Sequence, residues 1–394
     1  MTRRREAGMD RERKPTDLER LLAGRNRVSR RRFLQATGYG SMAAFLAACE
    51  RQLGRQPRAT GEPEPRLTGD IEDELIIYNW SAYLNPATIK AFEREFGVKV
   101  RATDFYESNE EMIAKLKGGA TGYDLIAPTG SYIPAMADEG LLMPLDRSRL
   151  PNLTNVNERF VGFAWDPENR YHVPKDWGTT GVGFLQKFVD EDVTSWRQFY
   201  ELGEKYSGKY TVLDSQYEVV GSALKMLGYS YNSDSQAEVD EALDVLIPFK
   251  PHIASITSSQ YRQMMGRGEI FLALGWNGDF FYVYEDQPSV KYVVPEEGTE
   301  YWIDVWSVPA DAPHPVAAHE FMNWILTPEN QGRETNYTYY ASCVTGAEDH
   351  TIKAIVNDPA IYPPADVTDK LEQAISEPQI VQLRADAWNR FLAA

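Results

Sequence analysis

The chain has few of the residues that most metal sites and thiol chemistry require. Its 394 residues include two cysteines, Cys49 and Cys343, and five scattered histidines. Two cysteines cannot build a disulfide framework, and neither an HExxH motif nor a closely spaced cysteine pair indicates a zinc site. We therefore expect no metal ion and no cofactor.

Positive charge is also scarce outside the N-terminal region. The chain has 41 Lys and Arg against 58 Asp and Glu, a formal net charge of −17. Residues 1–48 hold 12 of the basic and 5 of the acidic residues, so the remainder carries −24. Nucleic-acid binding needs basic patches, so this balance argues against it. An acidic surface mainly favours solubility and attracts cations only weakly.

Long apolar runs are missing as well. The most apolar stretch near the N-terminus, residues 36–48, is too short to cross a bilayer. It follows the basic segment SRRRFL at residues 29–34 and ends in the small residues LAA before Cys49. This order is typical of an export signal, which we assign to residues 1–48. Residues 49–71, rich in Arg, Pro and Gly, are expected to form a flexible tether.

Two short motifs refine this expectation. The pattern S-R-R-x-F-L resembles a twin-arginine export signal, which implies that the protein folds before export. The sequence LAAC resembles a lipobox, which implies a lipid on Cys49. We therefore expect an exported, lipid-anchored protein in the periplasm or on the outer face of the cytoplasmic membrane. An ordinary cleaved signal with an incidental cysteine is the alternative.

From about residue 72, strand and helix patterns alternate. Strands are predicted at residues 74–80, 98–105, 123–128, 210–213 and 270–276, with helices between them, two of which start at the capping-box residues Ser108 and Ser235. This alternation predicts an α/β fold with mostly parallel sheets. The length exceeds one ordinary domain, so we expect two lobes, with residues 171–185 crossing between them.

Two stretches point to the ligand: residues 269–281, which include the predicted strand 270–276, and residues 300–309. Both begin like buried strands. We expect each to end in an exposed tryptophan near an aspartate, Trp276 with Asp279 and Trp302 with Asp304. An indole face attracts a cation through its quadrupole, and a carboxylate pairs with the same charge directly. The combination favours a cationic ligand with an apolar stem, such as an aliphatic amine.

Several motifs together carry a family resemblance: YNWSAY at residues 78–83, YESNE at 106–110, LGYS at 227–230, WNG at 276–278 and WID at 302–304. In this order they resemble the spermidine/putrescine-binding proteins of ABC importers, within the extracellular solute-binding families. The resemblance implies a type II periplasmic-binding-protein fold, with a ligand cleft between two α/β lobes joined by crossover strands. We place the lobes at residues 72–176 plus 303–341 and residues 177–302 plus 342–394.

The resemblance also implies a ligand-binding site, carried over position by position. Its members are Trp80, Ser81, Tyr83, Thr129, Ser131, Glu218, Trp276, Asp279, Trp302, Asp304 and Tyr340. Ala82 stands where such proteins usually carry an acid, and Ser215 where the spermidine-type members carry an aspartate. The choice between putrescine and spermidine is therefore left open.

These observations lead to a functional hypothesis. We expect a monomeric, lipid-anchored receptor that captures a polyamine outside the cytoplasm and delivers it to the permease of an ABC importer. A receptor for another small cation such as thiamine is the first alternative. A secreted carbohydrate-active enzyme is the second, because carboxylates and tryptophans also suit sugars. A sensory lipoprotein is the third. No acid/base pair or nucleophile motif is visible, so we expect no enzyme.

Overall fold

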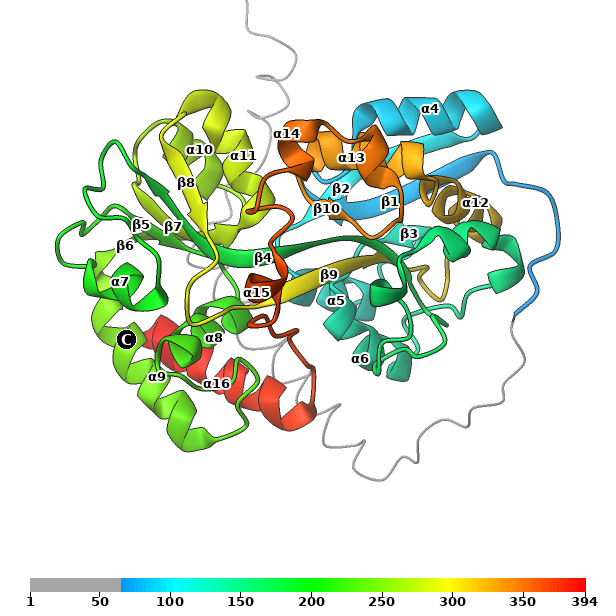
Figure 1. Cartoon of the computed structure of the whole chain (residues 1–394). Coiled ribbons are helices and arrows are strands. Elements are labelled where there is room, and N and C mark those ends of the chain that lie inside the picture. The colour runs from blue at the N-terminus through cyan, green and yellow to red at the C-terminus, as the bar shows by residue number, and fades with distance from the viewer. Residues whose placement is uncertain (1–64) are drawn as a thin grey trace, which may run out of the picture. The chain divides into compact units, whose positions relative to one another are not determined.

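A three-stranded and a seven-stranded β-sheet form the framework of the computed structural model, which describes residues 65–394 (Figure 1). The predicted export signal, the proposed lipidation site Cys49 and most of the predicted tether lie outside the described residues. Within residues 65–394, no helix combines the length and apolarity that crossing a bilayer requires.

The three-stranded sheet is parallel throughout, in the order β2-β1-β3. Its strands are β1 (Glu74–Trp80), β2 (Lys99–Tyr106) and β3 (Leu125–Ile126). The helices of this part are α4 (Pro86–Phe96), α5 (Asn109–Lys117), α6 (Ile133–Asp138), α12 (Pro315–Ile325) and α13 (Pro328–Thr338). This sheet agrees with the parallel βαβ arrangement expected from the alternating pattern.

The seven-stranded sheet is mixed. Its strands are β4 (Val173–Leu185), β5 (Tyr210–Val212), β6 (Ile253–Ile256), β7 (Leu272–Trp276), β8 (Val290–Val293), β9 (Tyr301–Trp306) and β10 (Ala341–Ser342). Strand β5 is parallel to β6 and β7, but β4 is antiparallel to β7, β8, β9 and β10. The prediction of mostly parallel sheets is therefore wrong for the strands around β4.

The remaining helices lie between residue 196 and the C-terminus, and most of them cover the second sheet. They are α7 (Trp196–Glu201), α8 (Gln216–Met226), α9 (Gln236–Phe249), α10 (Tyr261–Gly266), α11 (Asn277–Asp286), α14 (Lys353–Val356), α15 (Ala365–Thr368) and α16 (Pro378–Ala393). In Figure 1, α16 lies beside α8 and α9, with which it is in contact.

Strand β4 passes through both hydrophobic cores. Its first half pairs with β9, and its second half pairs with β7 and β8 (Figure 1). Val173 and Trp177 are buried in the core around β1 and α12, whereas Val182 and Phe184 are buried in the core around β5 and β7. This strand coincides with the segment predicted to cross between two lobes, and the two cores agree with the predicted fold class.

The boundaries of the lobes stay a prediction. The terminal helix α16 contributes Ala387, Trp388 and Phe391 to the second core. Five apolar residues between positions 343 and 361 pack in the first core instead: Cys343, Val344, Ala347, Ile355 and Ile361. Cys343 is fully buried, as expected for a small apolar residue.

Local sequence signals position the segments around the first sheet. The Asn85 side chain accepts a hydrogen bond from the backbone N–H of Ala87, and Pro86 occupies the first helical position of α4. The Ser108 hydroxyl accepts a hydrogen bond from the N–H of Glu111 at 3.1 Å and so starts α5. Both helices therefore start close behind the carboxyl ends of their strands.

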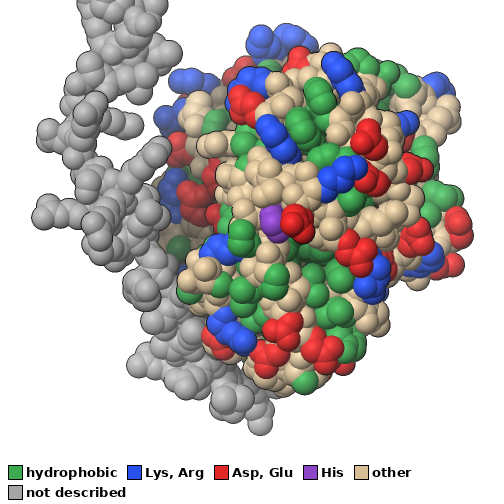
Figure 2. Space-filling view, turned by 90° about the vertical axis from the view of Figure 1, so that its left-hand side faces the viewer, with side chains coloured by type: hydrophobic (Ala, Val, Ile, Leu, Met, Phe, Trp, Pro, Cys, Tyr) green, Lys and Arg blue, Asp and Glu red, His purple; other side chains and the backbone are tan. Residues whose placement is uncertain are grey.

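Charged side chains on the surface are mixed in sign. Figure 2 shows one face on which acidic and basic groups lie interspersed. The acidic surplus of the sequence therefore does not gather into a single patch on that face.

Candidate functional site

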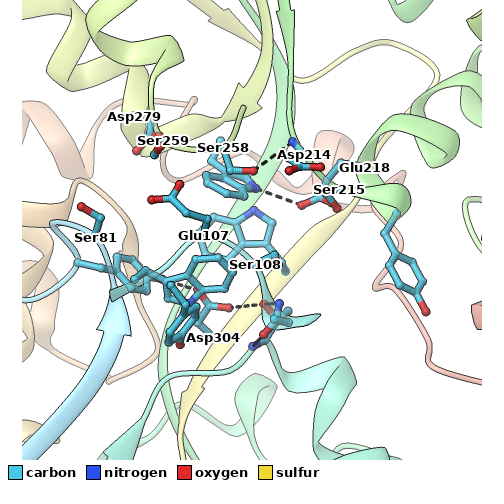
Figure 3. A pocket seen from close by; sticks show the side chains of 18 of the residues that line it. Ser81, Glu107, Ser108, Asp214, Ser215, Glu218, Ser258, Ser259, Asp279 and Asp304 are labelled. Atoms are coloured by element: carbon cyan, nitrogen blue, oxygen red, sulfur yellow. Dashed lines mark hydrogen bonds between the residues drawn. The ribbon is translucent and has the colours of Figure 1, made fainter. Parts of the chain in front are cut away.

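A cavity lies where the carboxyl ends of several strands meet. Trp80 ends β1, Thr129 follows β3, Ser215 follows β5, and Trp276 ends β7, and all four line the cavity. Figure 3 shows part of this lining, with Ser215, Glu218 and Asp304 labelled. Open α/β sheets bind ligands beyond the carboxyl ends of their strands. The strands of both sheets therefore deliver side chains to one place.

The structure brings all eleven predicted site residues to the lining of this cavity. They are Trp80, Ser81, Tyr83, Thr129, Ser131, Glu218, Trp276, Asp279, Trp302, Asp304 and Tyr340. Whether they bind a ligand stays a prediction. Sequence reasoning missed other charged lining residues: Glu107, Glu110, Asp214, Arg262 and Glu300.

Two indole rings form half-buried walls. Trp80 donates its indole N–H to the carbonyl oxygen of Ala127 at 2.8 Å, and Trp276 donates to the Glu218 carboxylate at 3.2 Å. The two ring centroids are 6.2 Å apart, with the rings inclined by 70°. Because both N–H groups are bonded, the orientation of each ring is fixed, and their remaining surface can contact an apolar stem.

The third tryptophan differs from its prediction. Trp302 is not an exposed residue at the end of a strand, because it is the second residue of β9 and is only 6% exposed. Its ring packs edge-on against Tyr340, with centroids 4.9 Å apart. The strand continues past Trp302 because β9 pairs with β4 from Tyr301 to Trp306. Trp302 thus forms a buried wall of the cavity.

Asp304 is held between the two sheets. An antiparallel bridge joins it to Thr129, whose hydroxyl donates to one carboxylate oxygen at 2.8 Å. The hydroxyl of Tyr83 lies 2.8 Å from the other oxygen. Burial, and then the nearby charge of Asp176, raise the pKa of Asp304 to about 7. The carboxyl group therefore titrates near neutral pH.

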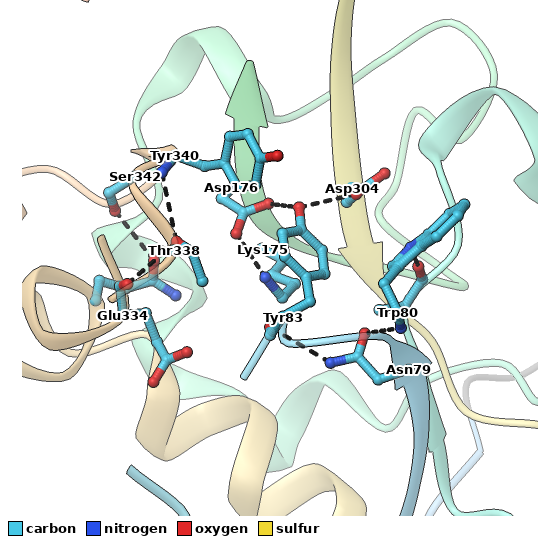
Figure 4. A network of polar contacts seen from close by, with 12 residues as sticks. Asn79, Trp80, Tyr83, Lys175, Asp176, Asp304, Glu334, Thr338, Tyr340 and Ser342 are labelled. Carbon is cyan, nitrogen blue, oxygen red and sulfur yellow. Dashed lines mark hydrogen bonds and ion pairs between the residues drawn. The ribbon is translucent and has the colours of Figure 1, made fainter. Parts of the chain in front are cut away.

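Strand β4 carries a buried ion pair, Lys175 with Asp176, which lies next to Asp304 (Figure 4). Lys175 binds Asp176 at 2.5 Å and lies 3.3 Å above the ring centre of Tyr83. The Tyr83 hydroxyl bridges the carboxylates of Asp176 and Asp304. A phenol carries one hydrogen, so it can donate to only one of them. The second contact needs a proton on a carboxyl group, which agrees with the raised pKa of Asp304.

Glu218 occupies the first turn of α8, where a carboxylate also complements the helix dipole. The Ser215 hydroxyl donates to one of its oxygens, and Trp276 donates to the other. Burial, and the negative charges of Glu110 and Asp304, raise the pKa of Glu218 to about 7. Among residues 65–394, neither Glu218 nor Asp304 takes part in any of the ion pairs seen.

Asp279 is in a different state, because it already has a cationic partner. Its oxygens accept hydrogen bonds from Tyr261 at 2.6 Å and from Tyr340 at 2.9 Å. The Arg262 guanidinium lies 3.4 Å away, and the charge of Asp279 raises the pKa of Arg262. A ligand ammonium at Asp279 would therefore have to compete with an internal guanidinium.

Among residues 65–394, the lining carries seven carboxylic acids and a single basic residue, Arg262. The acids are Glu107, Glu110, Asp214, Glu218, Asp279, Glu300 and Asp304. In the part of the chain that the structure describes, no group of three or more His, Cys, Asp or Glu residues is placed to hold a metal ion. An acidic cavity with aromatic walls suits an organic cation with apolar methylenes.

Comparison with known proteins places the chain in a family. Residues 87–363 match the family described as bacterial extracellular solute-binding protein. The putrescine-binding periplasmic protein PotF of Escherichia coli (strain K12) is 32% identical over 335 residues, which cover 80% of this chain and 90% of PotF. The chain belongs to the bacterial extracellular solute-binding protein family.

Solved structures agree with this assignment. The spermidine/putrescine ABC transporter substrate-binding protein PotD of Streptococcus pneumoniae aligns with a TM-score of 0.71 and 29% identity, covering 82% of this chain and 99% of that one. The Tp0655 lipoprotein of Treponema pallidum aligns with a TM-score of 0.71 and 26% identity, over 81% and 99%. The predicted two-lobed fold class is confirmed, and the chain is an exported solute-binding protein rather than an enzyme.

Proposed function

We propose that the chain captures a polyamine outside the cytoplasm and delivers it to the permease of an ABC importer. One observation carries the proposal: Glu218 and Asp304 line a cavity with indole walls, and neither has a basic partner among the described residues. The names of the relatives support it, since PotF is a putrescine-binding protein and PotD a spermidine/putrescine-binding one.

The binding energy of a diamine requires both the indole walls and the carboxyl groups. Burial of the four methylenes of a diamine contributes about 0.8 kcal/mol each, or roughly 3 kcal/mol in all. Micromolar affinity needs about 8 kcal/mol. Charge-assisted contacts must therefore supply most of the rest, and they outweigh desolvation only with good geometry and satisfied hydrogen bonds.

The proposed roles follow from the contacts of each residue. Trp80 and Trp276 pack against the methylenes, with Trp302 as the buried wall behind them. Glu218 and Asp304 bind the ammonium groups. The other proposed ligand residues are the polar side chains Ser81, Tyr83, Thr129, Ser131, Asp279 and Tyr340. Of these, Asp279 needs its Arg262 partner to move before it can bind an ammonium directly.

Thermal melting of the full chain tests the ligand class. Putrescine and spermidine should stabilise the protein, by about 2.7 kcal/mol at a hundred times the dissociation constant. Amino acids, thiamine and sugars serve as comparisons in the same panel. Stabilisation by thiamine and not by amines would favour the first alternative, and release of sugar from a glycoside would favour the second. A partner bound independently of polyamine would favour the sensory alternative.

We further propose a lipid on Cys49, export through a twin-arginine signal, and a monomeric state. The similar Tp0655 protein of Treponema pallidum is a lipoprotein, which supports the lipid anchor. Membrane fractionation of the wild type and Cys49→Ser tests it, because only the wild type should remain with the membrane after high-salt washing. Light scattering of the Cys49→Ser protein tests the monomeric state.

A further inference from the structure

Glu300 is a cavity residue that the family resemblance did not supply. It directly precedes β9 and is 4% exposed, yet it lines the same cavity as Glu218 and Asp304. Its backbone carbonyl accepts a hydrogen bond from the N–H of Thr180 on β4 at 3.2 Å. The main chain of Glu300 is therefore anchored to the strand that passes through both cores.

The Glu300 carboxylate is held by a neutral donor. The hydroxyl of Tyr231, which is 1% exposed, donates to one of its oxygens at 2.7 Å. None of the ion pairs seen within residues 65–394 includes Glu300. The basic groups near Tyr231 form no ion pair with Glu300: Arg384 donates to the carbonyl oxygen of Tyr231 at 2.7 Å, and Lys225 pairs with Glu372 at 2.8 Å.

A buried carboxylate without a cation is costly. Burial, and the charges of Glu218 and Asp304, raise the pKa of Glu300 well above its usual value. A buried carboxyl group of this kind either keeps a proton or needs a cation from outside. Because Glu300 lines the cavity, a bound ligand can supply that cation.

The charges of the cavity can now be counted. The lining acids Glu107, Glu110 and Asp214 are exposed residues, whose charge water can screen. Asp279 is neutralised by Arg262, whereas the less exposed Glu218, Asp304 and Glu300 have no basic partner among the described residues. Three ammonium groups of one ligand would neutralise these three carboxylates. A diamine would leave one of them buried and uncompensated.

We propose that Glu300 binds a third ammonium group and makes the receptor select a triamine over a diamine. Tyr231 acts as a positioning residue, because its hydroxyl fixes the carboxylate beside the cavity. This inference rests on the proposed function, since it specifies which polyamine the same cavity takes.

Calorimetric titration of the full chain tests the proposal with putrescine, spermidine and N8-acetylspermidine. The acetylated triamine keeps the carbon and nitrogen chain of spermidine but has two charges, because its third amine is a neutral amide. The wild type should bind spermidine at least about tenfold more tightly than either dication, because a charge-assisted contact to a buried carboxylate is worth about one factor of ten or more. Glu300→Gln should lower spermidine affinity by about that factor and putrescine affinity by less than about threefold.

Matched variants separate charge from fold. Glu204→Gln changes an exposed glutamate outside the cavity and should leave both affinities unchanged. Tyr231→Phe removes only the positioning hydroxyl and should reduce the preference for spermidine, with putrescine affinity retained. If Glu300→Gln does not fold, Tyr231→Phe tests the proposal instead, because an unchanged preference for spermidine in this variant would overturn it.

The remaining outcomes are distinct. If the wild type binds polyamines but Glu300→Gln keeps the preference, or loses both affinities equally, Glu300 is not a selective ligand and the proposed function stands. Equal binding of spermidine and its acetylated form by the wild type would also overturn the proposal. Should the wild type bind no amine at all, the proposed function fails and this inference fails with it.

Discussion

Putrescine affinity should depend strongly on pH, because Glu218 and Asp304, the two carboxyl groups proposed to bind its ammonium groups, titrate near neutrality. Glu218 and Asp304 both have a pKa raised to about 7, in each case first by burial. A protonated carboxyl cannot form an ion pair, so each group must lose its proton when the ligand binds. Alkylammonium groups stay charged throughout this range, since their pKa lies near that of lysine, about 10.

The size of the effect follows from the two pKa values. A group with a pKa of about 7 is about nine-tenths ionised at pH 8 and about one-tenth ionised at pH 6. Each carboxyl therefore weakens binding by about tenfold between these values, and the two together by about a hundredfold. At pH 7 each of the two groups is about half protonated, so bound putrescine should release about one proton.

Calorimetry measures both quantities. Titrations between pH 6 and pH 8 give the affinity, and titrations in buffers of different ionisation enthalpy give the number of protons released. The control Asp304→Asn removes one of the two groups, so its affinity should change by only about tenfold over the same range. An affinity that is constant from pH 6 to pH 8, without proton release, would refute the reasoning about buried carboxyl groups.

Three further predictions concern stability. In the absence of ligand, the free energy of unfolding of the wild type should fall by up to about 3 kcal/mol relative to that of Glu218→Gln as pH rises from 4.5 to 7. The reason is that a carboxyl group with a raised folded-state pKa stabilises the fold only while it is protonated. A difference in melting temperature between the two proteins that stays constant over this pH range would contradict this. Lys175→Met leaves Asp176 buried and unpaired and should cost about 3–5 kcal/mol in urea unfolding, whereas the double variant Lys175→Met/Asp176→Leu should be more stable than Lys175→Met. Gly183→Ala places a methyl group inside the ring of Phe280 and should destabilise by about 1–3 kcal/mol; an unchanged urea midpoint would contradict it.

Much of the fold could be predicted because local signals were strong. Strand β1 was predicted with the bounds that the structure has, and the capping residue Ser108 set the start of α5 correctly. Helix α11 was missed, because Asn277–Asp286 is rich in aromatic residues and begins with Asn-Gly, a pattern more typical of strands and turns. Packing decides here: Phe280 of α11 lies directly against Gly183 of β4.

The sequence predicted which residues line the cavity but not which of them already have a charged partner. Ordered motifs carried the proposed ligand residues, and all of them line one cavity. Sequence alone did not show that Arg262 neutralises Asp279, because that contact depends on how α10 packs against α11. The approach of Tyr231 to Glu300, 69 positions apart, was equally invisible.

The buried network links charge in the cavity to the strand that runs through both cores. Asp304 faces the cavity, and Tyr83 bridges it to Asp176 on β4 (Figure 4). If a bound ammonium group takes the proton's place at Asp304, the Tyr83 hydroxyl, with its single hydrogen, must choose between two ionised carboxylates. Lys175 stabilises the charge on Asp176, so the hydroxyl can turn towards Asp304 without leaving Asp176 unpaired. Ligand charge would thereby change the hydrogen bonding of the Asp176 side chain on β4, next to Trp177 in the core around β1 and α12.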